Sequence, residues 1–245
     1  MNLIEKYFWV LTTFLLPVLY LVVATAFYVL FYRSNNNKIQ RGKIQAAHLD
    51  NYQLKREVYY GISSLAIFCI TGFTVYLLQQ INYTLIYFLP FKYGVIYLFI
   101  SVILMMLFHD MYFYWTHRLL HLNGWFQKVH RVHHLSSNPS PFTALSFHPA
   151  EAFIQALVLP LMVMVIPSHP FALFCFLCFM VYKNVRGHAG YEFTTAAYRQ
   201  HKWNALHNYS IHHNLHHLHG RYNYGLYFTF WDRLMKTFRK EDQPV

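Results

Sequence analysis

Charged residues are scarce in this sequence of 245 residues: they make up 12% of it, whereas hydrophobic residues make up 56%. The charged fraction is about half of what soluble domains carry. A soluble protein this apolar would expose large apolar patches and would aggregate. The scarcity of charge therefore argues against an ordinary soluble domain and indicates that much of the chain lies in lipid.

Acidic residues are the rarer sign, with 9 Asp and Glu against 20 Lys and Arg, which gives a formal net charge of +11. In a soluble protein this excess would suggest a nucleic-acid partner. Here the basic residues flank apolar stretches, so anionic headgroups and the positive-inside rule explain them more simply. We expect no nucleic-acid partner.

Cysteine is also rare, and its three residues, Cys69, Cys175 and Cys178, all lie in apolar stretches. Cys175 and Cys178 form a CxxC motif, but no second CxxC is present to complete a zinc site. We interpret them as small packed hydrophobes and expect no disulfide framework. We expect no cleavable signal peptide either, because the first apolar stretch is too long for one.

Four apolar stretches are candidates for membrane insertion, since roughly 20 residues cross the hydrocarbon core. They cover about residues 7–32, 58–80, 93–115 and 152–182. The fourth is interrupted by Pro160, Pro167 and Pro170, so we expect a helical hairpin, either two tilted spans or a re-entrant pair. The predicted fold is all-α: one polytopic membrane domain over residues 1–245, with about four transmembrane helices, the last two a Pro-broken hairpin.

Basic residues are unevenly distributed between the loops. The loop after the first stretch carries Arg33, Lys38, Arg41, Lys43, Lys55 and Arg56. The loop after the second stretch carries only Lys92. By the positive-inside rule the first of these loops faces the cytosol, and the third stretch returns the chain to that side. Residues 116–150 and 183–245 are therefore expected to form a cytosolic helical cap.

Histidine is abundant, with 17 residues, and all but His48 lie between His109 and His219. Three groups stand out by their spacing: HxxxH at residues 117–121, HxxHH at residues 130–134 and HxxHH at residues 213–217. Residues three or four apart share one face of a helix, so the imidazoles of each box can reach a common ion.

A buried imidazole needs a hydrogen-bond partner or a metal, so three such boxes on one predicted membrane face indicate metal binding rather than a structural role. One divalent ion takes about four to six ligands, so this many imidazoles imply two ions. Imidazole suits iron, zinc and copper alike, so the ligand type leaves the element open.

Asp110 lies seven residues before His117, on the same predicted helical face. We expect its carboxylate to accept an imidazole N–H and to fix the tautomer of a metal ligand. The alternative is that Asp110 caps or neutralises the end of the third stretch. We favour the first role because acids within membrane segments are functional by default.

At these boxes the sequence resembles the fatty acid hydroxylase and sterol desaturase superfamily. The matching segments are FHDMYFYWTHRLLH at 108–121, HRVHHLSSNPSPFTALSFHPAE at 130–151, NVRGHAGYE at 184–192 and HHNLHHLHGRYNYGLYFTFWDRLMKT at 212–237. The resemblance covers about residues 59–237, with the histidine-box region at 109–237. THRLLH and NYGLYF are similar to the sterol C5-desaturase-like branch.

The resemblance implies a membrane-embedded enzyme that uses two iron ions and O2 to hydroxylate or desaturate a C–H bond of a lipid. Zinc on purification would not contradict iron. The metal ligands that it implies are His117, His121, His130, His133, His134, His188, His213, His216 and His217. His212 is a weaker candidate ligand, and Asn184, one turn before His188, is a candidate supporting residue.

Two positions depart from the family pattern. Asn184 stands where the fatty acid 2-hydroxylases have histidine, which argues against that branch. Lys236 stands where the family usually has glycine in WDRLxGT, and we expect this change to affect a turn and not the chemistry. Phe113, Trp115, Phe142 and Tyr191 are candidate walls of a lipid channel, with ordinary packing as the more common role for such residues.

The sequence contains no Rossmann fingerprint, P-loop or CxxCH haem motif, so the electrons must come from a separate protein, cytochrome b5-like or ferredoxin-like. The basic face could dock an acidic donor, or its charges could anchor it to headgroups. A zinc protease would need an HExxH motif, which is absent. A metal transporter would need its site near the bilayer midplane, whereas these histidines lie at the ends of the apolar stretches and in the cap. The remaining alternative is a degenerate or metal-handling membrane protein without turnover. The lipid, the carbon oxidised and the product, alcohol or alkene, stay open.

Overall fold

The computed structural model describes residues 3–45, 47–89 and 91–240, and it contains helices and no β-strand over these residues. The elements are α1 (Leu3–Phe27), η1 (Tyr28–Tyr32), α2 (Asn37–Gln40), α3 (Asn51–Gln80), α4 (Val95–Leu120), α5 (Asn123–Trp125), η2 (Phe126–His130), α6 (Arg131–His134), η3 (Pro141–Leu145), α7 (Pro149–Ala156), α8 (Val158–Val165), α9 (Pro170–Gly187), α10 (Ala196–Gln200), η4 (Asn204–Leu206), α11 (Ser210–His219) and α12 (Phe230–Leu234). The predicted all-α class is confirmed.

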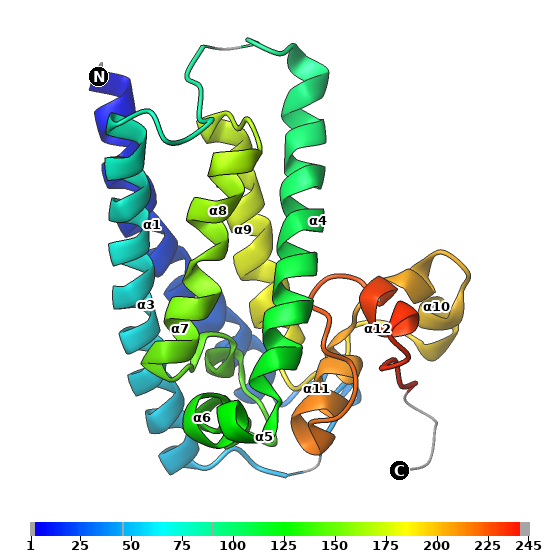
Figure 1. Cartoon of the computed structure of the whole chain (residues 1–245). Coiled ribbons are helices and arrows are strands. Elements are labelled where there is room, and N and C mark those ends of the chain that lie inside the picture. The colour runs from blue at the N-terminus through cyan, green and yellow to red at the C-terminus, as the bar shows by residue number, and fades with distance from the viewer. Residues whose placement is uncertain (1–2, 46, 90, 241–245) are drawn as a thin grey trace.

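Three helical segments are long and apolar enough to cross a membrane: Thr13–Tyr32, Asn51–Gln80 and Val95–Leu120. Figure 1 shows α1 and α3 on one side of the bundle and α4 on the other. Large apolar side chains on their outer faces are exposed, such as Phe14 at 67% and Ile96 at 75%. Such faces are stable only in lipid, so the chain is a multi-pass membrane protein.

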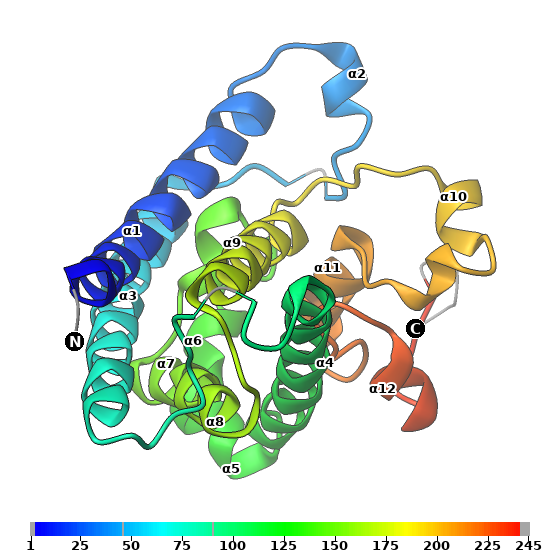
Figure 2. The ribbon, with the colours of Figure 1, turned by 90° about the horizontal axis from the view of Figure 1, so that it is seen from above.

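The fourth apolar stretch folds as the expected hairpin. α7 and α8 form one arm, which lies between α3 and α4, and α9 forms the other, which lies between α1 and α4 (Figures 1 and 2). Pro160 lies inside α8 and Pro170 is the first residue of α9. Because its arms are shorter than the three long helices, the total of about four crossings stays a prediction. The hairpin fills the centre of the bundle with buried side chains such as Met162, Leu173 and Phe176.

A buried carboxylate joins the membrane helix α3 to the cap. Glu57 is fully buried, and its oxygens accept hydrogen bonds from Ser140 Oγ, from Thr143 Oγ1 at 2.8 Å and from Gln53 Nε2 at 2.7 Å. A carboxylate this far from solvent is tolerated only when it is hydrogen-bonded. Glu57 therefore holds the η3 segment against α3, and with it the loop that follows the second histidine box.

Lys236 adopts the left-handed conformation that glycine favours, with φ of +58°. The chain reverses here after α12, and the next residue, Thr237, donates its N–H to Asp232 O at 2.7 Å. A side chain in this conformation costs about 1–2 kcal/mol. The departure from the family pattern therefore lies at a turn, as expected, and that it leaves the chemistry unchanged stays a prediction.

We predict that Lys236→Gly raises the free energy of unfolding by about 1 kcal/mol, because the strain at φ of +58° is relieved. Met235→Gly is the control, since Met235 has an ordinary φ of −92° and glycine there should lower stability. The measurement is the thermal unfolding midpoint of the purified proteins in detergent. A lower midpoint for Lys236→Gly than for the wild type would contradict the argument.

Candidate metal centre

Nine histidine side chains from four segments converge at the end of the bundle where α4 and α9 end. The first group contains His117, His121, His130, His134 and His216. The second group contains His133, His188, His213 and His217. Within each group the candidate ligand atoms all lie within 4.8 Å of one another. The structure thus brings together all nine histidines that the resemblance singled out.

Short-range helical geometry arranges each box. His117 and the C-cap residue His121 lie one turn apart at the end of α4. A π-helical turn, η2, leads to His130, and α6 follows it directly with His133 and His134. π-Helical turns are rare and often occur at functional sites.

The third box lies on α11, where His213, His216 and His217 share one face. Gly220 ends this helix with φ of +67°, and a Cβ added there would lie 3.6 Å from the ring of His121. The turn after the third box therefore lies against the first box.

Backbone carbonyls orient three of the rings. Nδ1 of His117 donates to Tyr224 O at 2.9 Å, Nδ1 of His216 to Tyr222 O at 2.7 Å, and Nδ1 of His188 to Asn184 O at 2.8 Å. A carbonyl oxygen only accepts, so in each neutral ring the proton lies on Nδ1 and the lone pair on Nε2. These Nε2 atoms face the other imidazoles of their groups.

In the second group, the facing nitrogen atoms of His133 and His188 are suited to bind a cation. Nδ1 of His133 donates to Ser146 O at 3.4 Å, and Nε2 of His133 lies 3.3 Å from Nε2 of His188. Burial, followed by the neighbouring imidazoles, lowers the pKa of His133 well below its usual value, and burial lowers the pKa of His188 to about 4. Both rings are therefore neutral, and two lone pairs face each other. A metal ion between them replaces this repulsion with two bonds.

The first group also contains a nitrogen atom that is available to a cation. Nε2 of His117 is buried and has no hydrogen-bond partner within the described part of the chain. The two groups are neighbours, since the ring centroids of His134 and His217 are 4.8 Å apart and those of His213 and His216 are 5.6 Å apart. The arrangement therefore suits two adjacent ions rather than one.

Glu151 supports the first group and was not predicted. Its Oε1 lies 2.7 Å from Nδ1 of His130, and both side chains are 1% exposed. A carboxylate that accepts the Nδ1 proton leaves Nε2 of His130 free for a metal and increases the basicity of the ring. Sequence reasoning passed over Glu151 because it lies outside the boxes. An isolated acid at the start of an apolar stretch was the available signal.

Asp110 does not make the expected imidazole contact. Its Oδ1 accepts the backbone N–H groups of Tyr227 at 2.7 Å and Phe228 at 3.2 Å. The physical reason is distance, because seven residues are two helical turns, or about 10 Å along the axis. Asp110 instead fixes the segment after α11, whose residues Tyr222 and Tyr224 hold two of the imidazoles.

His212 differs from expectation, whereas Asn184 supports a ligand as expected, but through its backbone. His212 lies outside both groups, where its Nδ1 accepts the N–H of Tyr209 at 3.4 Å, because a shift of one residue from His213 turns it about 100° around the helix. The side chain of Asn184 donates to Ala144 O at 3.0 Å, so Asn184 supports His188 through its backbone carbonyl and not through its amide.

An apolar cavity lies beside the histidines, between α1, α3, α4 and the hairpin. The space within it that is open to the centre of a water molecule is about 130 Å³. Phe113 and Phe147 line it, and their rings lie 4.9 Å from His117 and 5.0 Å from His133 respectively. Of the four aromatic residues considered as channel walls, Phe113 is the one among the lining residues of this cavity.

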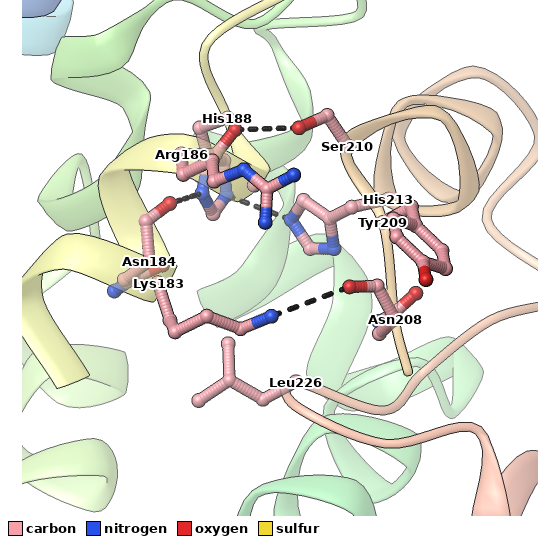
Figure 3. A pocket seen from close by; sticks show the side chains of 10 residues that line it. Lys183, Asn184, Arg186, His188, Asn208, Tyr209, Ser210, His213 and Leu226 are labelled. Atoms are coloured by element: carbon pink, nitrogen blue, oxygen red, sulfur yellow. Dashed lines mark hydrogen bonds between the residues drawn. The ribbon is translucent and has the colours of Figure 1, made fainter. Parts of the chain in front are cut away.

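A small polar pocket opens on the second group from another direction (Figure 3). Lys183 and Arg186 line it together with His188 and His213, and Nζ of Lys183 donates to Asn208 O at 3.4 Å. Asn184 and Leu226 line both this pocket and the apolar cavity. The histidine centre therefore has an apolar side and a basic, polar side.

The site and fold define a membrane protein with two adjacent histidine groups, each able to hold a metal ion, next to an apolar cavity. The sequence model of the family described as fatty acid hydroxylase matches residues 102–237. This is more than half of the chain, which therefore belongs to the fatty acid hydroxylase family.

Sterol-modifying enzymes are among its relatives. The chain is 31% identical to "Lathosterol oxidase" of Homo sapiens over 189 residues, which cover 76% of this chain and 62% of the relative. It is 34% identical to "Delta(7)-sterol 5(6)-desaturase erg32" of Schizosaccharomyces pombe over 157 residues, 63% of this chain and 44% of the relative. The chain thus spans no more than about three fifths of these relatives. They support the sterol C5-desaturase-like branch. No solved structure matches the chain.

We predict that His216→Ala lowers the metal content of the purified protein by about one ion per chain, whereas His212→Ala leaves it unchanged. The two residues lie on the same helix, but only His216 belongs to a group. Without His216 the first group has one imidazole ligand fewer for a metal ion. Elemental analysis of both variants checks this, and a similar loss in His212→Ala would contradict the assignment.

Glu151→Ala should weaken metal binding at the first group by about 10- to 100-fold, because His130 loses the acceptor for its Nδ1 proton. Glu151→Gln keeps an acceptor oxygen at the same place and should retain most of the affinity. Competition with a chelator of known affinity measures the effect. Equal affinities for Glu151→Ala and the wild type would show that the contact with His130 does not matter.

Proposed function

We propose that this chain is a di-iron oxidoreductase of the membrane that uses O2 to hydroxylate or desaturate a C–H bond of a lipid, with a sterol-like substrate favoured over a fatty acyl or ether lipid. The observation that carries the proposal is the set of buried, neutral imidazoles whose lone pairs face one another beside an apolar cavity. The sterol names of the relatives support the choice of substrate.

In this proposal the first histidine group holds one iron and the second group holds the other, while the chain fixes each ligand. When bound, the iron pair would activate O2 for attack on an unactivated C–H bond. The carbonyls of Tyr222, Tyr224 and Asn184 keep the Nδ1 protons in place, and Glu151 does the same for His130. Phe113 and Phe147 line the cavity next to His117 and His133, where their apolar rings help to exclude water from the site of oxidation.

The reaction needs an outside source of electrons. Hydroxylation consumes one O2, two electrons and two protons per turnover and releases one water, whereas desaturation consumes the same and releases two waters. The chain has no motif for a redox cofactor besides the histidine boxes. We therefore propose a separate electron carrier, cytochrome b5-like or ferredoxin-like, as partner.

We also propose that the histidine centre faces the cytosol. Of the 20 Lys and Arg residues, all but Lys6 and Lys92 lie in segments at the same end of the bundle as the histidines. The positive-inside rule favours the cytosol for that end. The basic rim would also attract an acidic electron carrier.

The test is O2 uptake and lipid analysis with purified, iron-loaded protein in nanodiscs that contain a sterol and receive electrons from a chemical reductant. We expect O2 consumption that depends on the sterol, and a product that differs from it by one added oxygen or two lost hydrogens in mass spectrometry. His133→Ala is the inactive control. Full metal loading without O2 uptake or product would favour the non-catalytic, metal-handling alternative.

A further inference from the structure

A small lobe made of α10, η4 and α12 projects sideways from the bundle near its histidine end. In Figures 1 and 2, α10 and α12 lie on the outer side of α4, away from the hairpin. The lobe therefore lies outside the area that the membrane helices cover, on the side where lipid surrounds α4. Its level along α4 decides whether it meets that lipid.

The lobe contacts α4 at the expected boundary of the hydrocarbon core. The ring of Trp231 on α12 lies 5.9 Å from that of Trp115 and 6.1 Å from that of Tyr114. Counted from Val95, where α4 begins, Trp115 lies about 20 residues or about 30 Å along the helix axis. The hydrocarbon core is about 30 Å thick, and tryptophan is enriched at its two boundaries. α12 is therefore placed at the level where lipid meets water.

Asp232 determines which face of α12 is buried. It is 1% exposed, and its two carboxylate oxygens accept the backbone N–H groups of Tyr224 at 2.9 Å and Gly225 at 2.8 Å. Residues two positions away on a helix lie about 200° around its axis, so Phe230 and Leu234 lie on the opposite face. They are 56% and 59% exposed. α12 thus directs its acid inward and two large apolar side chains outward.

The η4 segment adds to this apolar surface. Thr229, which precedes α12, donates its N–H to Leu206 O at 2.8 Å and its Oγ1–H to Ala205 O at 3.0 Å. Leu206 is 44% exposed, and Trp203, the N-cap residue of η4, is 66% exposed. Nζ of Lys202 lies 5.4 Å from the centre of the Trp203 ring. An amphipathic ring beside a basic residue is favoured at the level of the headgroups.

The charges of the lobe restrict what covers it. Over residues 193–240 the only acid is Asp232, which is buried, whereas Lys202, Arg233 and Lys236 are exposed. A surface that combines large apolar side chains with basic ones suits a bilayer whose headgroups are anionic. The electrostatics alone would also suit an acidic protein, so the choice depends on the neighbouring surface.

That neighbouring surface is the lipid-facing side of α4. Leu107, Met111 and Trp115 follow one another at intervals of four residues on one face, and they are 52%, 37% and 44% exposed. Trp231 contacts Trp115, and its ring lies 5.3 Å from that of Phe230. The apolar surface therefore continues from the span onto the lobe. A bilayer covers both without a further component, whereas a soluble protein would have to displace lipid at their border.

We infer that the lobe is an interfacial membrane anchor: η4 and α12, with Phe230 and Leu234 foremost, dip into the boundary between headgroups and acyl chains on the histidine side. The anchor is connected to the histidines. Asp232 holds the backbone of Tyr224, whose carbonyl accepts the Nδ1 proton of His117. Contact with the bilayer thus holds the segment that orients one imidazole. The inference rests on the membrane spans and not on the proposed oxidation.

The test measures the depth of single nitroxide spin labels in the bilayer. Full-length protein whose native cysteines are replaced by alanine is loaded with zinc, which is diamagnetic, and placed in nanodiscs of phosphatidylcholine and phosphatidylglycerol. One label is attached at Phe230→Cys, Leu234→Cys or Trp203→Cys. Power-saturation EPR compares collisions with O2, which concentrates in lipid, and with a nickel chelate, which stays in water. Leu107→Cys on α4 is the lipid control, and Asn51→Cys, an exposed residue at the start of α3, is the water control.

The ratio of O2 collisions to chelate collisions at residues 230 and 234 should be several-fold higher than at Asn51 and lower than at Leu107. The label at Trp203 should also exceed the Asn51 value. Equal zinc content in all variants shows that they fold, and because the three lobe positions are labelled separately, one poorly folded variant does not decide the result.

A ratio at residue 230 or 234 equal to that at Asn51 would overturn the inference. Protection from the chelate that appears only after an acidic electron carrier is added would assign the surface to a soluble partner and would overturn it as well. Spin–spin broadening between labels at residue 234 would assign the surface to a second copy of the chain, with the same consequence. None of these readouts requires turnover, so a protein without oxidase activity can still support the anchor.

The proposed function is likewise tested apart from the anchor, because O2 uptake and product formation do not report the depth of the lobe.

Discussion

The structure depends on one constraint: nine neutral imidazoles, of which seven are buried and two, His121 and His134, are half-buried, are packed so closely that their lone pairs face one another. Such an arrangement is unfavourable without a cation, because each pair of facing nitrogens loses hydration and gains repulsion. With cations it becomes a set of strong bonds. A cation bound at either group would therefore contribute its binding free energy to the folding of this end of the molecule, as in other proteins whose sites form only on folding.

The surroundings of the histidines serve to keep the lone pairs directed inward. Three backbone carbonyls and Glu151 bind the outer nitrogen of their rings. Asp110 holds the backbone of Tyr227 and Phe228, and Glu57 holds the η3 segment. Asp110 and Glu57, two acids of the membrane helices, thus bind the loops that orient the imidazoles. From the sequence, Asp110 was instead expected to contact an imidazole directly.

The sequence predicted the parts of the site that depend on local geometry. Spacings of three and four residues place His117 with His121 and His213 with His216 and His217 on common faces, and proline positions located the hairpin. Contacts between segments far apart in the chain could not be predicted from the sequence in the same way. The approach of Glu151 to His130 depends on how α7 packs beside η2, and the exclusion of His212 depends on the rotation of α11, neither of which follows from spacing. The apolar cavity has no sequence signature, because its walls come from seven different helical elements.

The topology of the hairpin sets an order of assembly. His188 is the residue that follows α9, the returning arm of the hairpin, and it belongs to the second group with His133, which precedes the hairpin in the chain. Both groups are complete only when α11 has followed the returning arm, because α11 supplies His216 to the first group and His213 and His217 to the second. A chain arrested before α9 therefore carries two histidine boxes but lacks a complete set of ligands in either group.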